Sequence, residues 1–421
     1  MEQERENNGS SSFEDSDQGE VKKKLFGATA LLFLARQWGG VATVLTLTVL
    51  ARELSLESLG RFTFYLSLFA FLESFVDFGS GTLTLKQGAA SATKFNQALA
   101  SARKLRLTTG AFAFLVIALS AHFLERDRAG WIVLAGLYPL TRCLETSSLV
   151  YQVHVRFDVP VAIRTAVATC RALTLIVLVS QGHTSPGPLI AVHAAWTSVG
   201  HSLQHLFAGR RLRALPKSAS SPLVPFFFRA LPLALTGVLQ QGYFYIDNLL
   251  IRGMLGEEAL GLYNASARLF SGLALLAAYA TTAALPWFAR QDAKGQLESA
   301  LRGLQKPLLI GGVCSVLFLW PFAEPALVLI FGPGFEAAAG SLRWLLVGVC
   351  FVSVGAAPLT ALIAKGLYWS VASIACVALV LNLVVNFVLL PTMGIQGAAI
   401  ATVLSEAAVA GASLLLLRQQ R

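Results

Sequence analysis

The chain consists largely of apolar runs of about 20 residues separated by short polar breaks. A run of that length crosses a hydrocarbon layer of roughly 30 Å as an α-helix. Strands are disfavoured, because an open sheet edge leaves backbone groups without hydrogen bonds in lipid. Only 13% of the residues are charged and 55% are hydrophobic, which excludes an ordinary soluble protein. The pattern predicts an all-α polytopic membrane protein with about twelve transmembrane helices.

One motif occurs twice, at a spacing close to half of the chain length. Leu54-Ser-Leu-Glu-Ser-Leu-Gly60-Arg-Phe62 aligns with Leu255-Gly-Glu-Glu-Ala-Leu-Gly261-Leu-Tyr263, an offset of 201 residues in a chain of 421. Repeated helical bundles are common in transporters. An even number of helices in each repeat makes both repeats enter from the same face. The motif therefore predicts two six-helix lobes related by a pseudo-two-fold axis along the membrane normal.

Charge and composition divide the chain into four parts. Residues 1–24 are polar, rich in acidic residues, and end in three lysines. This composition predicts a disordered cytoplasmic tail. Residues 209–224 are basic and contain Ser and Pro, and we interpret them as a cytoplasmic linker between an N-lobe at 25–208 and a C-lobe at 225–421. Lys and Arg concentrate in alternate loops, which places both termini in the cytoplasm.

Ionisable side chains inside the predicted spans are the best site candidates, because a charge exposed to lipid costs several kcal/mol. Arg36 and Glu73 lie near the middle of the first and second spans. Two interpretations stay open: Arg36 binds an anion with Glu73 as its partner or as a proton carrier, or the two form a structural ion pair. Asp77 lies one turn from Glu73 on the same helix face.

The fourth and fifth spans, at about 130–151 and 160–180, carry further charges. Arg142 and Glu145 are three residues apart, a spacing at which they can neutralise each other on one helix face. Arg171 has no acid on its own helix. It therefore needs a partner from another helix or an anionic ligand.

Two acids are candidates for gating or coupling in the second half of the chain. Asp247 and Arg268 flank a short hairpin and could pair as an outer gate, or could hold the hairpin together. Glu406 lies in the middle of the last span and is a candidate for ion coupling. Asn382 and Asn386 share a helix face, which favours interhelical hydrogen bonds.

Four motifs in the same order resemble one transporter family. They are Ala51-Arg52-Glu-Leu54-Ser-x-Glu57-x-x-Gly60-x-Phe62, Tyr245-Ile-Asp247 with Leu255-Gly-x-x-x-Leu-Gly261-x-Tyr263-x-x-x-Ala267-Arg268-Leu269, Ile330-Phe331-Gly332-x-Gly334-Phe335, and Leu381-Asn382-Leu-x-x-Asn386-x-x-Leu-Leu-Pro391-x-x-Gly394-Ile-x-Gly397-Ala-Ala-x-Ala401-Thr402. The chain resembles polysaccharide exporters of the O-antigen flippase type, in the multidrug/oligosaccharidyl-lipid/polysaccharide (MOP) flippase superfamily.

The resemblance implies a MATE/MurJ-like fold and a transporter rather than an enzyme. It implies alternating-access transfer of a polyprenyl-pyrophosphate-linked oligosaccharide from the cytoplasmic to the periplasmic leaflet of the bacterial inner membrane, for O-antigen, capsule or exopolysaccharide synthesis. The bilayer, a polysaccharide polymerase and export machinery are the implied partners, without nucleic acid or cofactor. The matching substrate-binding residues are Arg36, Arg142 and Arg171, and the coupling or gating residues are Glu73, Asp77, Asp247, Arg268 and Glu406.

Two other functions are compatible with a protein of this class. A cation-coupled multidrug antiporter of the same superfamily needs an acidic cavity, and the arginines inside the spans argue against it. A membrane glycosyltransferase or polymerase usually carries acids in a substantial outer loop, whereas this chain offers only the short turn Glu125-Arg-Asp127. No loop is long enough for a nucleotide-binding domain, so an ion gradient, the membrane potential or the substrate gradient must drive transport.

Overall fold

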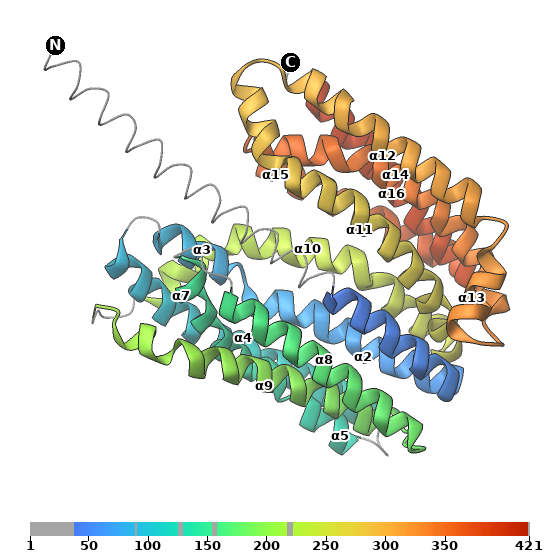
Figure 1. Ribbon diagram of the computed structural model, residues 1–421, viewed down its shortest axis with the longest axis horizontal. Helices are drawn as coiled ribbons and strands as arrows, with labels where there is room; N and C mark the ends of the chain where they lie inside the picture. Colours follow the sequence, from blue (N-terminus) through green and yellow to red (C-terminus); the bar gives the residue numbers. More distant parts are fainter. Residues whose placement is uncertain (1–37, 89–90, 125–128, 154–157, 217–221, 420–421) are drawn as a thin grey trace, which may run out of the picture. The chain divides into compact units, whose positions relative to one another are not determined.

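The computed structural model describes residues 38–88, 91–124, 129–153, 158–216 and 222–419, and this part of the chain forms helices and no strands (Figure 1). A helix at residues 38–53 precedes the labelled elements. These are α2 (Leu56–Asp77), α3 (Ser80–Gly88), α4 (Ala92–Leu124), α5 (Ala129–Ala135), α6 (Tyr138–Glu145), η2 (Thr146–Ser148), α7 (Leu149–Gln152), α8 (Asp158–Ser180), α9 (Pro186–Arg213), α10 (Leu223–Leu255), α11 (Glu257–Ala293), α12 (Leu297–Leu319), α13 (Ala323–Phe331), η3 (Glu336–Ala338), α14 (Ala339–Ala364), α15 (Tyr368–Met393) and α16 (Ile395–Gln419).

The chain is a multi-pass membrane protein. Among the described residues, seven helices are long and apolar enough to cross a membrane, and the bent pair Leu223–Leu235 and Gly237–Leu255 within α10 gives an eighth. The all-α fold is the one expected from the sequence, but this number does not reach twelve. The count of twelve spans therefore stays a prediction.

One reason for the lower number is that the fourth predicted span is not a continuous helix. It consists of α5, α6, the single 3-10 turn η2 and α7, with a turn at Gly136 and Leu137 between the first two. Pro139, the second residue of α6, has no backbone N–H, so it cannot continue the hydrogen bonding of α5. Short 3-10 segments within a longer helix often mark hinges.

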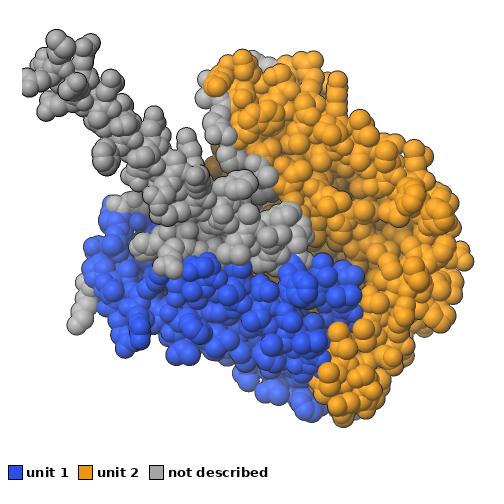
Figure 2. All heavy atoms as spheres, viewed as in Figure 1, with its two compact units in different colours: residues 1–46, 80–175, 191–230 blue, residues 47–79, 176–190, 231–421 orange. Residues whose placement is uncertain are grey.

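Contacts within the chain divide it into two compact units (Figure 2). Unit 1 contains residues up to 46, 80–175 and 191–230. Unit 2 contains 47–79, 176–190 and 231–421. The second predicted span thus packs mainly with the later helices, although it is early in the sequence. The division into six-helix lobes at 25–208 and 225–421 stays a prediction.

The later helices of unit 2 pack around α14. In Figure 1, α12, α14 and α16 run side by side, and their contacts are among the most extensive in the unit. Small residues permit this packing: a Cβ added to Gly355 of α14 would lie 3.0 Å from the Cα of Ala410 in α16. In lipid there is no hydrophobic driving force for helices to associate. Close van der Waals contact at small residues therefore stabilises such pairs.

The duplicated motif packs against its own copy where α2 crosses α11. A Cβ added to Gly60 would lie 1.8 Å from the carbonyl oxygen of Glu257, and one added to Gly261 would lie 2.6 Å from the carbonyl oxygen of Leu56. Leu56 and Glu257 occupy equivalent positions in the two copies. Each glycine therefore faces the same position of the opposite copy, as the predicted pseudo-two-fold relation requires.

Polar side chains strengthen this crossing. Asn264 of α11 donates a hydrogen bond of 3.1 Å to Thr63 of α2, again 201 residues away. Glu257 accepts from Arg61 Nε at 2.7 Å and from Arg252 Nε at 3.1 Å. Arg252 also stacks on Phe64, 4.0 Å from the ring centre. Two arginines sharing one carboxylate, all only 10–15% exposed, tie α2, α10 and α11 together.

We predict that Gly60→Ala destabilises the protein, because its methyl group overlaps the backbone of α11. Overpacking of this kind typically costs about 1–3 kcal/mol. Gly272→Ala on α11 is the matched control, since a Cβ there meets nothing within 4 Å. The melting temperature of the purified protein should fall for Gly60→Ala and should be unchanged or slightly higher for Gly272→Ala. Equal melting temperatures would contradict the proposed backbone contact.

Candidate functional site

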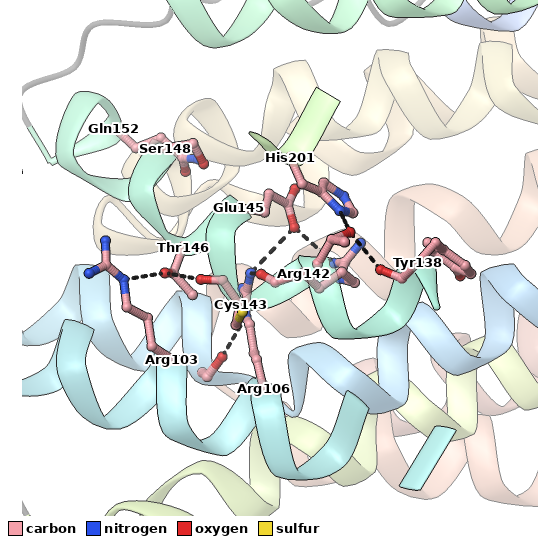
Figure 3. Close-up of polar contacts among 12 residues, drawn as sticks. Arg103, Arg106, Tyr138, Arg142, Cys143, Glu145, Thr146, Ser148, Gln152 and His201 are labelled. Atoms are coloured by element: carbon pink, nitrogen blue, oxygen red, sulfur yellow. Dashed lines mark hydrogen bonds and ion pairs between the residues drawn. The ribbon is translucent and has the colours of Figure 1, made fainter. Parts of the chain in front are cut away.

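Three arginines from three helices of unit 1 form ion pairs with one carboxylate. Figure 3 shows two of them, Arg106 and Arg142, beside Glu145. Glu145, at the end of α6, lies 3.3 Å from Arg142 of its own helix and 3.3 Å from Arg106 of α4. Arg164 of α8 lies 3.2 Å away on the other carboxylate oxygen. We call these four residues the Glu145 cluster. The pair of Arg142 with Glu145 is the one that the sequence predicts.

The local packing of α4 and α6 places Arg106 in this cluster. Gly110 lies one turn further along α4, and a Cβ there would be 2.8 Å from the carbonyl oxygen of Pro139. Without that side chain, α6 approaches α4 closely. Arg106 also donates from Nε to Ser80 Oγ at 3.0 Å, and its side chain is only 5% exposed. The guanidinium is thus held in one orientation.

The 3-10 turn next to the cluster is also bonded to basic side chains. Arg103 of α4 donates to Thr146 Oγ1 at 3.1 Å and to Ser147 Oγ at 2.9 Å. His205 of α9 lies on the other side, with its Nδ1 2.7 Å from Ser147 Oγ. These contacts connect the 3-10 turn with two neighbouring helices.

A buried histidine completes this region. His201 Nδ1 lies 2.8 Å from Thr141 Oγ1, and the same hydroxyl donates to the carbonyl oxygen of Tyr138 at 2.6 Å. The Thr141 hydroxyl thus connects His201 of α9 with the first turn of α6.

Unit 1 is strongly basic. Its described residues contain twelve Lys and Arg but only two acids, Glu145 and Asp158. Arginine guanidinium groups bind carboxylates and phosphates through paired hydrogen bonds. Arg106 is buried, and Arg103, Arg142 and Arg171 are partly buried, which favours an anionic ligand over a cationic one.

Arg171 lies two turns from Arg164 on the same helix, α8. Its Nη1 is 3.5 Å from Thr197 Oγ1 of α9, so it contacts a different helix, as the sequence suggests. One turn further along α8, Thr174 accepts from the indole of Trp196 at 3.1 Å. Arg36, the third arginine predicted to bind substrate, lies outside the described residues.

The hydrogen-bond partners of Asp247 differ from Arg268, the partner that the sequence suggests. Its carboxylate accepts from Tyr263 at 2.7 Å, Thr402 at 2.9 Å and Asn386 at 2.8 Å. These hydrogen bonds to α11, α16 and α15 replace the suggested contact with Arg268. The Asn386 bond is the interhelical one expected from the sequence. A pair of Asp247 with Arg268 is not among the ion pairs of the described residues.

Glu406 lies one turn from Thr402 on α16. Its carboxylate accepts from the hydroxyl of Tyr243 at 2.7 Å. Tyr243 in turn lies one turn before Asp247 on α10. Asp247 of α10 thus accepts from a hydroxyl of α16, and Glu406 of α16 accepts from a hydroxyl of α10. Both carboxylates are buried.

The other predicted gating residues lie on α2 and α11. Glu73 and Asp77 are partly exposed near the end of α2. Arg268 of α11 and Tyr245 of α10 are close enough to interact electrostatically.

Sequence reasoning missed Arg106 and Arg164 as cluster residues. Arg106 stands in the charged stretch Arg103-Lys-Leu-Arg106, which is typical of a polar loop, but α4 begins at Ala92 and the side chain of Arg106 is buried. A helical signal was available: Phe95, Leu99 and Ala102 precede it at intervals of three and four, and all are buried. For Arg164, no comparable signal exists.

The structure matches solved transporters of one fold. MurJ, a lipid II flippase in an inward closed conformation, has a TM-score of 0.73 at 13% identity, over 93% of this chain and 87% of that one. An inward-facing MATE-family multidrug resistance transporter of the MOP superfamily has a TM-score of 0.69 at 16% identity, over 90% and 94%. A MOP-superfamily transporter from Pyrococcus furiosus has 0.61 at 15%, over 94% and 93%.

Family models connect the chain to the same group at the level of sequence. No curated protein sequence matches it significantly. The model described as polysaccharide biosynthesis protein matches residues 28–291, and the model of the lipid II flippase MurJ matches residues 169–421. Each covers more than half of the chain, and the structural matches support both. The chain therefore belongs to the polysaccharide biosynthesis protein family, and it also matches the model of the lipid II flippase MurJ.

Proposed function

We propose that the protein is a flippase that moves a polyprenyl-pyrophosphate-linked oligosaccharide from the cytoplasmic to the periplasmic leaflet for surface polysaccharide synthesis. The observation that carries this proposal is the Glu145 cluster, an arginine-rich site inside a helical unit of a polysaccharide-biosynthesis and flippase fold. Its chemistry fits a pyrophosphate, whose oxygens accept paired hydrogen bonds from guanidinium groups.

Two arginines described here are proposed to bind the pyrophosphate. Arg142 belongs to the Glu145 cluster, and Arg171 lies on the same helix as Arg164, about 10 Å further along its axis. Arg36 is proposed as a third contact from its position in the sequence. A series of arginines along the transport direction would hold the charged group while the lipid tail stays in the bilayer.

Coupling is proposed for the buried carboxylates of unit 2. Asp247 and Glu406 receive their hydrogen bonds from neutral hydroxyl and amide groups. A buried carboxylate without a cation is costly, so uptake of a proton or a cation stabilises it. Glu73, Asp77 and Arg268 are proposed to take part in gating where α2, α10 and α11 meet.

The setting of this function follows from the family and from the charge distribution. We propose a bacterial inner-membrane location with both termini cytoplasmic, and a polysaccharide polymerase with export machinery as partners. The MATE likeness also fits a multidrug antiporter. The basic interior of unit 1 favours an anionic substrate over a cationic drug.

Deletion of the gene should reduce surface polysaccharide and cause the lipid-linked oligosaccharide to accumulate on the cytoplasmic side. The block occurs after synthesis of the oligosaccharide and before its polymerisation, so the intermediate cannot be consumed. Surface glycans and extracted lipid-linked intermediates measure both effects. Unchanged glycans together with increased sensitivity to cationic drugs would support the antiporter instead.

Arg171→Gln should reduce transport by roughly 10- to 100-fold, because it removes a charge-assisted hydrogen bond to phosphate worth about 1.5–3 kcal/mol. Arg302→Gln is the control, since Arg302 pairs with Glu298 on the exposed face of α12. Flipping of a labelled lipid-linked oligosaccharide in proteoliposomes provides the measurement. Normal transport by stably inserted Arg171→Gln protein would rule out a substrate contact for this residue.

Asp247→Asn should preserve the fold but change coupling. The amide oxygen can still accept from Asn386, while Tyr263 and Thr402 can accept from the amide nitrogen, because hydroxyls serve in either role. Asp247→Leu should instead cost about 1–3 kcal/mol by leaving donors unsatisfied. Melting temperature separates the two variants. Transport by Asp247→Asn should lose its response to a proton or cation gradient, and a retained response would exclude coupling at Asp247.

A further inference from the structure

We propose that Glu145 is a resident anion which the pyrophosphate of the substrate displaces, and that Arg106 and Arg164 bind the phosphate in its place. This inference rests on the proposed flippase function and deepens it. It assigns substrate contacts to two arginines of α4 and α8. It also means that the Glu145 carboxylate competes with phosphate and lowers the affinity of the site for it.

The geometry of the cluster is that of a phosphate site filled by a carboxylate. Three guanidinium groups, carried by α4, α6 and α8, converge on the two oxygens of Glu145 at 3.2–3.3 Å. Carboxylate and phosphate oxygens accept the same paired hydrogen bonds from arginine. Three arginines exceed the need of one carboxylate, whereas they match the two or more charges of a pyrophosphate.

The side chains of the Glu145 cluster differ in exposure, and the exposed side offers the ligand a path into the cluster. The side chain of Arg164 is 54% exposed, whereas those of Arg106, Arg142 and Glu145 are 5%, 13% and 14% exposed. A phosphate can first meet the exposed Arg164 and then reach the buried arginines. Contact strength should rise along that path, because charges interact more strongly where water is excluded.

The backbone around Glu145 allows the carboxylate to leave. Glu145 is the last residue of α6, a helix of only eight residues, and directly precedes the 3-10 turn η2. The turn at Gly136 and Leu137 bounds the same helix at its other end. A short helix between two breaks can rotate with small changes in backbone angles, since a hinge needs only a few residues to absorb the motion. Such a rotation would withdraw Glu145 from Arg106 and Arg164.

A purely structural ion-pair cluster makes the opposite prediction for loss of the carboxylate. In that case Glu145→Gln leaves buried guanidinium groups without compensation, and both folding and ligand binding deteriorate. If Glu145 competes with phosphate, the same change removes the competitor. Binding then becomes tighter, and the ligand restores the stability that the variant has lost.

The test is binding of a polyprenyl pyrophosphate without sugar to the full-length protein in nanodiscs of phosphatidylcholine. Glu145→Gln should bind at least 10-fold more tightly than the wild type and should show a larger rise in melting temperature with the lipid. Arg106→Gln and Arg164→Gln should bind at least 10-fold more weakly. Arg302→Gln, whose partner Glu298 is exposed on α12, should bind like the wild type.

The outcomes separate the two levels of the proposal. Wild-type binding with unchanged or weaker binding by Glu145→Gln would overturn the exchange and leave the flippase proposal standing. Absence of saturable binding by every protein would overturn the flippase proposal as well. Equal competition by phosphatidylglycerol would show a general phospholipid site and overturn the pyrophosphate assignment. If Glu145→Gln does not fold, Glu145→Asp, whose carboxylate is one methylene shorter, should bind more tightly by a smaller factor, and weaker binding would again overturn the exchange.

Discussion

The structure depends on how each charge inside the apolar helices is compensated, because an isolated charge there would prevent stable insertion. Two different solutions occur. In unit 1, three arginines surround the single carboxylate of Glu145. In unit 2, Asp247 is compensated by neutral donors from three helices. The first solution leaves positive charge in excess, and the second leaves a negative charge that a proton or cation can neutralise.

The crossing of α2 and α11 shows how the duplicated sequence is used in the fold. The motif contributes a glycine from each copy, and each glycine admits the backbone of the other helix. Because lipid supplies no hydrophobic force between helices, such close backbone contact is a major source of specificity. Glu257 and its two arginines add a polar rim to the same contact. The repeat thus brings together two helices that are 201 residues apart in sequence.

The sequence predicted those features that a single helix or a repeat determines. The all-α membrane fold followed from the apolar runs, and the pair of Arg142 with Glu145 followed from helical spacing. The partners of Asp247 could not be found in this way, because Tyr263, Asn386 and Thr402 lie on three other helices. Arg268 lies across the hairpin from Asp247 in the sequence, but sequence distance does not set proximity in a bundle. Arg164 joins the cluster only through the packing of α8, which no local pattern encodes.

The breaks in the fourth span connect these observations with transport. A continuous helix would fix Arg142 and Glu145 relative to α4 along its whole length. The segments α5, α6 and η2 instead allow the eight-residue part that carries both charges to move as a short body. Irregular backbone at membrane depth is tolerated where protein or a wet cavity surrounds it, and Arg103 and His205 satisfy the hydroxyls of the 3-10 turn here. Binding of an anion can change the position of α6 only if the positions with Glu145 on the arginines and with Glu145 withdrawn differ in their affinity for that anion. The exchange of Glu145 for phosphate supplies such a difference.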